Sequence, residues 1–116
     1  MKKVEDLDVI KLPHSLTLHI FNLTKTFPEE EKFGLISQMR RAVYSIPMNL
    51  MEGAPRFSSK EYGQFIGIAK GSAGEMKYQL LLGRDLKYIP KDTYSILLPE
   101  YERVSQMLTK LAKSLE

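Results

Sequence analysis

The chain has 116 residues, enough for one hydrophobic core but too few for two, so we expect a single domain over residues 1–116. It contains no cysteine, which excludes disulfides and thiolate chemistry, and no apolar run long enough for a signal peptide or a membrane span, so we expect a cytoplasmic protein. The net charge of +3 and the pI near 9.1 permit nucleic-acid binding without requiring it.

A first helix is expected over residues 12–26, where apolar residues recur at helical spacing: Leu12, Leu16, Ile20, Leu23 and Phe27. Pro13 would lie in the first turn of this helix, where proline is tolerated. Pro28 then breaks the pattern. The acidic run at 29–31 indicates the start of a short turn that Gly34 ends.

A second helix is expected over residues 35–52, with Gly53 in its stop signal. Its core stripe would consist of Leu35, Met39, Ala42, Val43, Ile46 and Leu50. Another face carries Tyr44, Met48 and Met51, so apolar side chains occur on two opposite sides of the helix. We therefore expect Tyr44, Met48 and Met51 to contact a second surface, as part of an oligomer interface.

A narrow polar stripe lies beside that core stripe and consists of Gln38, Arg41, Ser45, Asn49 and Glu52. A solvated helix face would carry mostly lysine and glutamate instead. Arg41 or Arg56 is suited to pair with Glu52 or Glu75, because arginine offers a planar fork to a carboxylate. We favour a polar network of all seven residues that fixes helix register or subunit geometry; a ligand or nucleic-acid site is the alternative.

A third helix is expected over residues 58–86, opened by a capping box of Ser58 and Glu61. Its core stripe would consist of Tyr62, Phe65, Ile66, Ala69, Ala73, Met76 and Leu80. Four of the chain's seven glycines share another face: Gly63, Gly67, Gly71 and Gly74. Each costs about 1 kcal/mol relative to alanine inside a helix, so we expect a close helix contact, at an oligomer interface, to offset that cost.

A fourth helix carries a seam at spacings of four and three: Leu97, Tyr101, Val104, Leu108, Leu111 and Leu115. Pro99 either kinks or restarts it, so its start is left open between Asp92 and Pro99. No strand pattern is evident. Four helices with short connections predict an all-α, up-down-up-down four-helix bundle.

Basic residues supply the candidates for nucleic-acid contact: Arg40, Lys60, Lys70, Lys77, Arg84, Lys87, Arg103, Lys110 and Lys113. The alternative is a solvated helix surface. Because no recognition helix or stacking motif is evident, binding should be directed to the phosphate backbone and sensitive to salt.

No catalytic residue, metal ligand or cofactor site is predicted. His14 and His19 are five residues apart, whereas a spacing of four would present both on one helical face. No motif supplies a nucleophile for the carboxylates Glu52 and Glu75 to assist. We therefore expect a protein that is not an enzyme.

Much of the chain resembles one protein family, most strongly over residues 27–75. The segments that carry the resemblance include Phe27-Pro28-Glu29-Glu30-Glu31-Lys32-Phe33-Gly34-Leu35, Gln38-Met39-Arg40-Arg41-Ala42, Ser45-Ile46-Pro47-Met48-Asn49, Glu52-Gly53, Ser59-Lys60-Glu61-Tyr62 and Ile68-Ala69-Lys70-Gly71-Ser72. They are similar to the intervening-sequence proteins encoded within bacterial 23S ribosomal RNA genes.

The resemblance implies four-helix bundles that assemble into homopentameric rings. It also implies a relation to the accessory variability protein (Avd) of diversity-generating retroelements, a basic pentameric barrel that binds nucleic acid and the reverse transcriptase. We expect a homo-oligomer that binds RNA or DNA non-specifically through basic surface. The alternative is an Avd-like docking scaffold, for example for a retroelement reverse transcriptase, without nucleic-acid affinity of its own.

Overall fold

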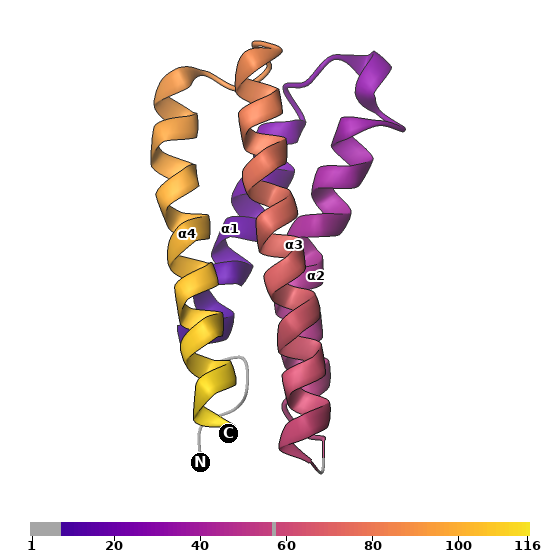
Figure 1. The fold of residues 1–116 in the computed structure, drawn as a ribbon. Coiled ribbons are helices and arrows are strands. Elements are labelled where there is room, and N and C mark those ends of the chain that lie inside the picture. Colours follow the sequence, from indigo (N-terminus) through magenta and orange to yellow (C-terminus); the bar gives the residue numbers. More distant parts are fainter. Residues whose placement is uncertain (1–7, 57) are drawn as a thin grey trace.

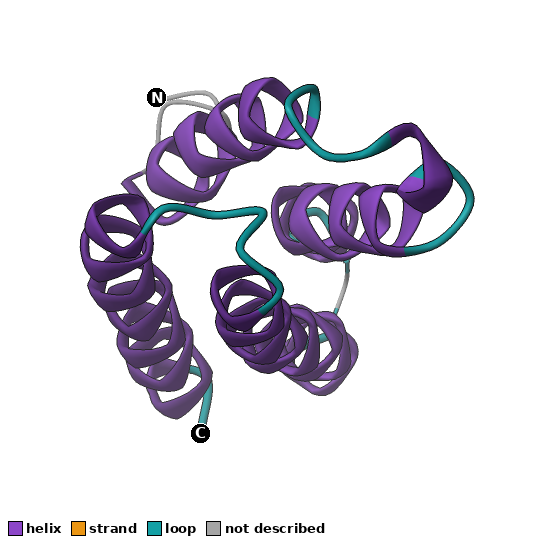
Figure 2. Ribbon diagram, turned by 90° about the horizontal axis from the view of Figure 1, so that it is seen from above, coloured by secondary structure: helices purple, strands orange, loops and turns teal. Residues whose placement is uncertain are grey.

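The computed structural model of the protein describes residues 8–56 and 58–116 and contains four α-helices and one short 3-10 helix (Figure 1). The α-helices are α1 (Asp8–Thr24), α2 (Leu35–Gly53), α3 (Ser59–Asp85) and α4 (Lys91–Ser114), and the 3-10 helix η2 (Glu29–Glu31) lies between α1 and α2. Consecutive helices are antiparallel neighbours, and the contact between α1 and α4 is smaller than the contact of either helix with its neighbour in the chain (Figure 2). The predicted all-α four-helix bundle is confirmed. No helix in the described part of the chain is both long and apolar enough to cross a bilayer.

The core lies along the bundle axis and receives apolar side chains from every helix. Its fully buried members include Ile20, Met39, Val43, Leu50, Ala69, Ala73, Met76, Leu80, Tyr101 and Leu108. These positions belong to the stripes that helical periodicity predicts. Tyr62, Phe65, Leu111 and Leu115 belong to the same stripes but are only half-buried, because they lie near the ends of the bundle.

The expected bounds of the first helix are wrong at both ends. α1 already includes Asp8, so the buried Pro13 lies inside the helix. Pro13 has no backbone donor, but its carbonyl accepts a hydrogen bond from the Thr17 hydroxyl at 2.8 Å. The helix ends at Thr24, because the next three backbone N–H groups, from Lys25 to Phe27, each bond to the carbonyl three residues earlier.

The bounds of the other helices agree with the predicted ones to within a residue, or fix a bound that the prediction left open. α2 runs through the buried Pro47 and ends at Gly53, one residue past the predicted end. The Ser58 hydroxyl accepts a hydrogen bond from the Glu61 N–H at 3.1 Å, which confirms the predicted cap of α3. The start of α4 was left open and is now fixed at Lys91, so the exposed Pro99 lies within a continuous helix.

The α3–α4 turn and η2 lie at the same end of the bundle, the upper end in Figure 1, and are joined there. The Tyr88 hydroxyl donates to Glu31 Oε2 at 3.0 Å, and the rings of Phe27 and Tyr88 are 5.3 Å apart. The hydrogen bond to Glu31 and partial desolvation raise the pKa of Tyr88. Lys87 adopts a left-handed conformation (φ 65°) in this turn, where the Tyr88 and Ile89 N–H groups both bond to the Gly83 carbonyl.

Candidate nucleic-acid interface and polar cleft

The glycine face of α3, made by Gly63, Gly67, Gly71 and Gly74, is not covered by any other described part of the chain. Apart from the adjacent backbone of α3 itself, a Cβ atom at any of these four positions would have no described atom within 4 Å. By contrast, a Cβ at Gly53 would lie 2.7 Å from Phe65 Cβ, so Gly53 permits close packing inside the bundle. The chain's own helices therefore do not make the close contact that the glycine face was expected to make, and the helix cost of these glycines is not offset within one protomer.

An apolar strip follows the outer side of α2 and consists of Tyr44, Met48 and Met51, which are 40%, 50% and 44% exposed. Leu18 of α1, 60% exposed, extends this α2 strip. Leu18 and Met51 line a groove of about 340 Å³ between α1 and α2. The sequence indicated that the three residues of α2 lie on a second apolar face, but Leu18 was missed. Its position outside the core stripe of the first helix was a signal that it is exposed.

The polar stripe of α2 forms a hydrogen-bonded cluster in its middle part. The Ser45 hydroxyl accepts from Ser72 Oγ and from Asn49 Nδ2, both at 2.9 Å, and Asn49 is buried. Further along α3, the buried Gln79 donates to Glu75 Oε2 at 3.2 Å. Sequence reasoning missed Ser72 and Gln79. Their spacing from Glu75, three before it and four after it, places all three on one side of α3.

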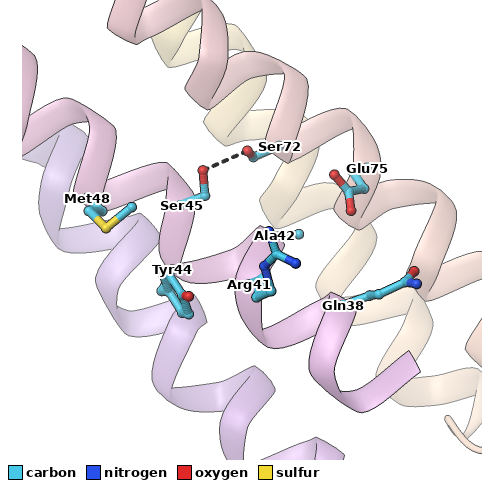
Figure 3. Close-up of a pocket in the computed structure, with 8 residues that line it drawn as sticks. All are labelled: Gln38, Arg41, Ala42, Tyr44, Ser45, Met48, Ser72 and Glu75. Atoms are coloured by element: carbon cyan, nitrogen blue, oxygen red, sulfur yellow. Dashed lines mark hydrogen bonds between the residues drawn. The ribbon is translucent and has the colours of Figure 1, made fainter. Parts of the chain in front are cut away.

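The four charged residues of the predicted polar network, Arg41, Glu52, Arg56 and Glu75, do not lie together. Arg56 pairs with Glu52 at 3.5 Å on the surface near the α2–α3 connection. Arg41 and Glu75 form no ion pair with each other or with any other described residue. Both instead face a polar cleft between α2 and α3 (Figure 3).

This α2–α3 cleft has a volume of about 420 Å³. Its walls are Gln38, Arg41, Ala42, Tyr44, Ser45 and Met48 from α2 and Ser72 and Glu75 from α3. Figure 3 shows the Arg41 guanidinium and the Glu75 carboxylate directed into the space between the two helices. The cleft thus presents hydrogen-bond donors from α2 and an acceptor from α3, with apolar side chains at its edge.

Three predicted basic residues form a row along α3, because Lys70, Lys77 and Arg84 are seven residues apart, which is close to two helical turns. The Arg84 guanidinium lies 4.6 Å from the centre of the Tyr94 ring, so this α3 basic row runs along the side next to α4. Arg84 Nε also contacts Asp85 Oδ1 at 3.0 Å.

The remaining basic candidates are spread over the surface. Lys60 is exposed at the start of α3, Lys87 is exposed in the α3–α4 turn, and three residues are exposed on α4: Arg103, Lys110 and Lys113. Arg40 is different, because its side chain donates to Thr24 Oγ1 at 2.9 Å and to the Phe21 carbonyl at 3.2 Å. These bonds tie the Arg40 side chain of α2 to the end of α1.

Titratable side chains do not gather in a way that suggests metal binding. In residues 8–56 and 58–116, no three His, Asp or Glu side chains are placed to hold an ion together. The chemistry that the described surface offers is hydrogen bonding, apolar contact and attraction of anions.

Fold and surface together define a four-helix bundle with two uncovered faces, a polar cleft and a row of basic side chains. Residues 5–110 match the profile of the 23S rRNA-intervening sequence protein family, and the chain belongs to this family. The resemblance seen in the sequence is thereby confirmed.

The fold is also similar to the crystal structure of a protein with unknown function from the S23 ribosomal protein family of Bacteroides thetaiotaomicron. The TM-score is 0.84, with 24% identity, over 90% of this chain and 98% of that chain. At this level of identity the similarity shows the fold alone. No curated protein matches the chain.

Proposed function

We propose that the protein is a non-enzymatic, cytoplasmic homo-oligomer that binds RNA or DNA through its basic surface without sequence specificity. The observation that carries the proposal is the α3 basic row. Lys70, Lys77 and Arg84 repeat about every 10 Å along one helix, since each residue advances the helix by about 1.5 Å. A row of cations attracts a phosphate backbone and releases its counterions, and this attraction does not depend on base sequence.

Self-association would strengthen that attraction, because several copies multiply a net charge of +3. Two features support an oligomer: the bare glycine face of α3 and the exposed α2 strip. In water, each leaves surface that a neighbouring copy could bury with a gain in free energy. The family resemblance further supports a ring of five copies.

The proposal is tested by retention of labelled RNA and DNA, single-stranded and duplex, across a salt series. In the variant Lys70→Glu/Lys77→Glu, we expect weaker retention and a shallower slope of log K against log salt, by about 0.9 per lost phosphate contact on duplex. Lys25→Glu/Lys32→Glu is the matched control, because both lysines are exposed on the connection between α1 and α2. Equal losses in the two variants would contradict a role for the α3 basic row.

A second candidate function is an accessory scaffold that docks a protein, for example a retroelement reverse transcriptase. In that case the exposed α2 strip would contact the docked protein instead of a neighbouring copy, because apolar side chains at an exposed surface often mark a protein contact, and the glycine face would hold the oligomer together. No retention of nucleic acid at low salt, with the oligomer intact, would support the scaffold instead. A reverse-transcriptase gene beside this one would support it further, whereas a position inside a ribosomal RNA gene would favour the intervening-sequence role.

A further inference from the structure

We propose that the α2–α3 cleft binds a guanine base of a single-stranded nucleic acid. This inference rests on the proposed function and adds to it, because a surface that contacts only phosphates would gain one pocket that recognises a base. The volume of the cleft, about 420 Å³, lies within the range of small-molecule sites, about 300–1,000 Å³.

The polar groups of the cleft match the edges of guanine. Glu75 on the α3 side accepts hydrogen bonds only, and guanine presents two adjacent donors, N1–H and the N2 amino group. Arg41 on the α2 side donates only, and guanine O6 and N7 are the acceptors that arginine contacts most often in nucleic acids. The exocyclic amino group of adenine lies between two ring acceptors, and that of cytosine has one ring acceptor and a C–H group beside it, so neither base offers Glu75 a pair of adjacent donors. Free phosphate is disfavoured, since its charge would face the Glu75 carboxylate.

The structure already holds Glu75 in place. Gln79, only 4% exposed, donates to Glu75 Oε2 at 3.2 Å and leaves Oε1 without a protein partner among the described residues. The hydrogen bonds from Ser72 and Asn49 to Ser45 fix one wall of the cleft. Glu75 and the wall at Ser45 would therefore need little reorganisation when a ligand binds, which favours binding.

Tyr44 and Met48 complete the site with apolar surface at its edge (Figure 3). Single-stranded bases are commonly held by stacking on an aromatic ring together with hydrogen bonds to their edges. Both residues also belong to the α2 strip, where we propose a subunit contact. The cleft would then lie beside that contact, so binding is measured on the assembled protein.

The test compares three labelled RNA decamers: ten uridines, and the same strand with one central guanine or one central adenine. For the native protein we expect the guanine decamer to bind about tenfold more tightly than the other two, since a good bidentate contact discriminates by about 1–3 kcal/mol. Glu75→Gln should remove that preference, and it should change the affinity for ten uridines no more than the loss of a carboxylate elsewhere on the surface does. Glu102→Gln, which removes an exposed carboxylate of α4, is the matched control.

A second measurement, titration with guanosine and uridine 5′-monophosphates, separates the cleft from the basic surface. Decamer binding without a guanine preference, or with one that Glu75→Gln leaves intact, overturns the cleft assignment and leaves the proposed function standing. If no decamer is retained while guanosine monophosphate alone saturates, the proposed function fails and the guanine site stands. If neither decamer nor guanosine monophosphate binds, both fail. Thermal melting of each variant checks that the bundle remains folded.

Discussion

The glycine face of α3 allows one substitution to affect the protomer and the assembly in opposite directions. Alanine at Gly67 or Gly71 places its methyl group where, apart from the adjacent backbone of α3, no described atom lies within 4 Å, so none of the described residues opposes it. Alanine is favoured over glycine inside a helix by about 1 kcal/mol. The variant Gly67→Ala/Gly71→Ala should therefore raise the free energy of unfolding of the dilute protomer by about 2 kcal/mol.

Gly53→Ala is the control, because its methyl group would lie 2.7 Å from Phe65 Cβ and 3.0 Å from Phe65 Cγ. Phe65 Cβ is attached directly to the backbone of α3 and can move away only if the two helices separate. Overpacking of this kind costs about 1–3 kcal/mol, so this variant should be less stable than the native protein.

Urea unfolding, followed by helical circular dichroism at high dilution, measures both variants. Molecular mass at higher concentration measures their association. We expect the double alanine variant to be the more stable protomer and the weaker oligomer, because added methyl groups hold a neighbouring copy away. A double variant that is destabilised at high dilution would refute the structural reasoning. One that associates like the native protein would refute the role of this face in assembly.

Three further substitutions test other details of the bundle. Tyr101→Phe should raise the free energy of unfolding by about 1 kcal/mol in urea titrations, since the Tyr101 hydroxyl is buried without a hydrogen-bond partner in the described structure and burial raises its pKa. Lys87→Gly should also stabilise, by about 1 kcal/mol, because the left-handed conformation (φ 65°) strains a residue with a side chain. The hydrogen bond to Glu31 raises the pKa of Tyr88. The contribution of this bond to the free energy of unfolding is therefore fully present below the ordinary pKa of tyrosine and is lost as the pH rises through the raised pKa. Tyr88→Phe should therefore show a smaller loss of stability between neutral and strongly alkaline pH, measured by melting.

The features that the sequence predicts well are local. The core stripes and the cap at Ser58 follow from residues three and four positions apart, which are neighbours on any helix. The same reliance on local signals gave the wrong start for α1. Pro13 reads locally as a first-turn residue, but packing buries it in the interior of a longer helix.

The site was harder to predict because its members come from different helices. Which residues of α3 face Ser45 depends on how α2 and α3 pack, and no short-range pattern contains that information, so Ser72 was missed. Arg40 shows the same limit, since its bonds to Thr24 and Phe21 join segments far apart in sequence. Gln79 is different, because it bonds to Glu75 four residues earlier on the same helix, a spacing that the sequence does show. The glycine face was visible in the sequence, but only the structure shows that the protomer leaves it bare.

The most direct test of the account is retention of nucleic acid across a salt series, with the molecular mass of the protein measured in the same buffers. We predict the mass of an assembly of several chains of 13.3 kDa each, and retention whose log K falls linearly with log salt. A single-chain mass without retention at low salt would contradict both the assembly and its binding to nucleic acid.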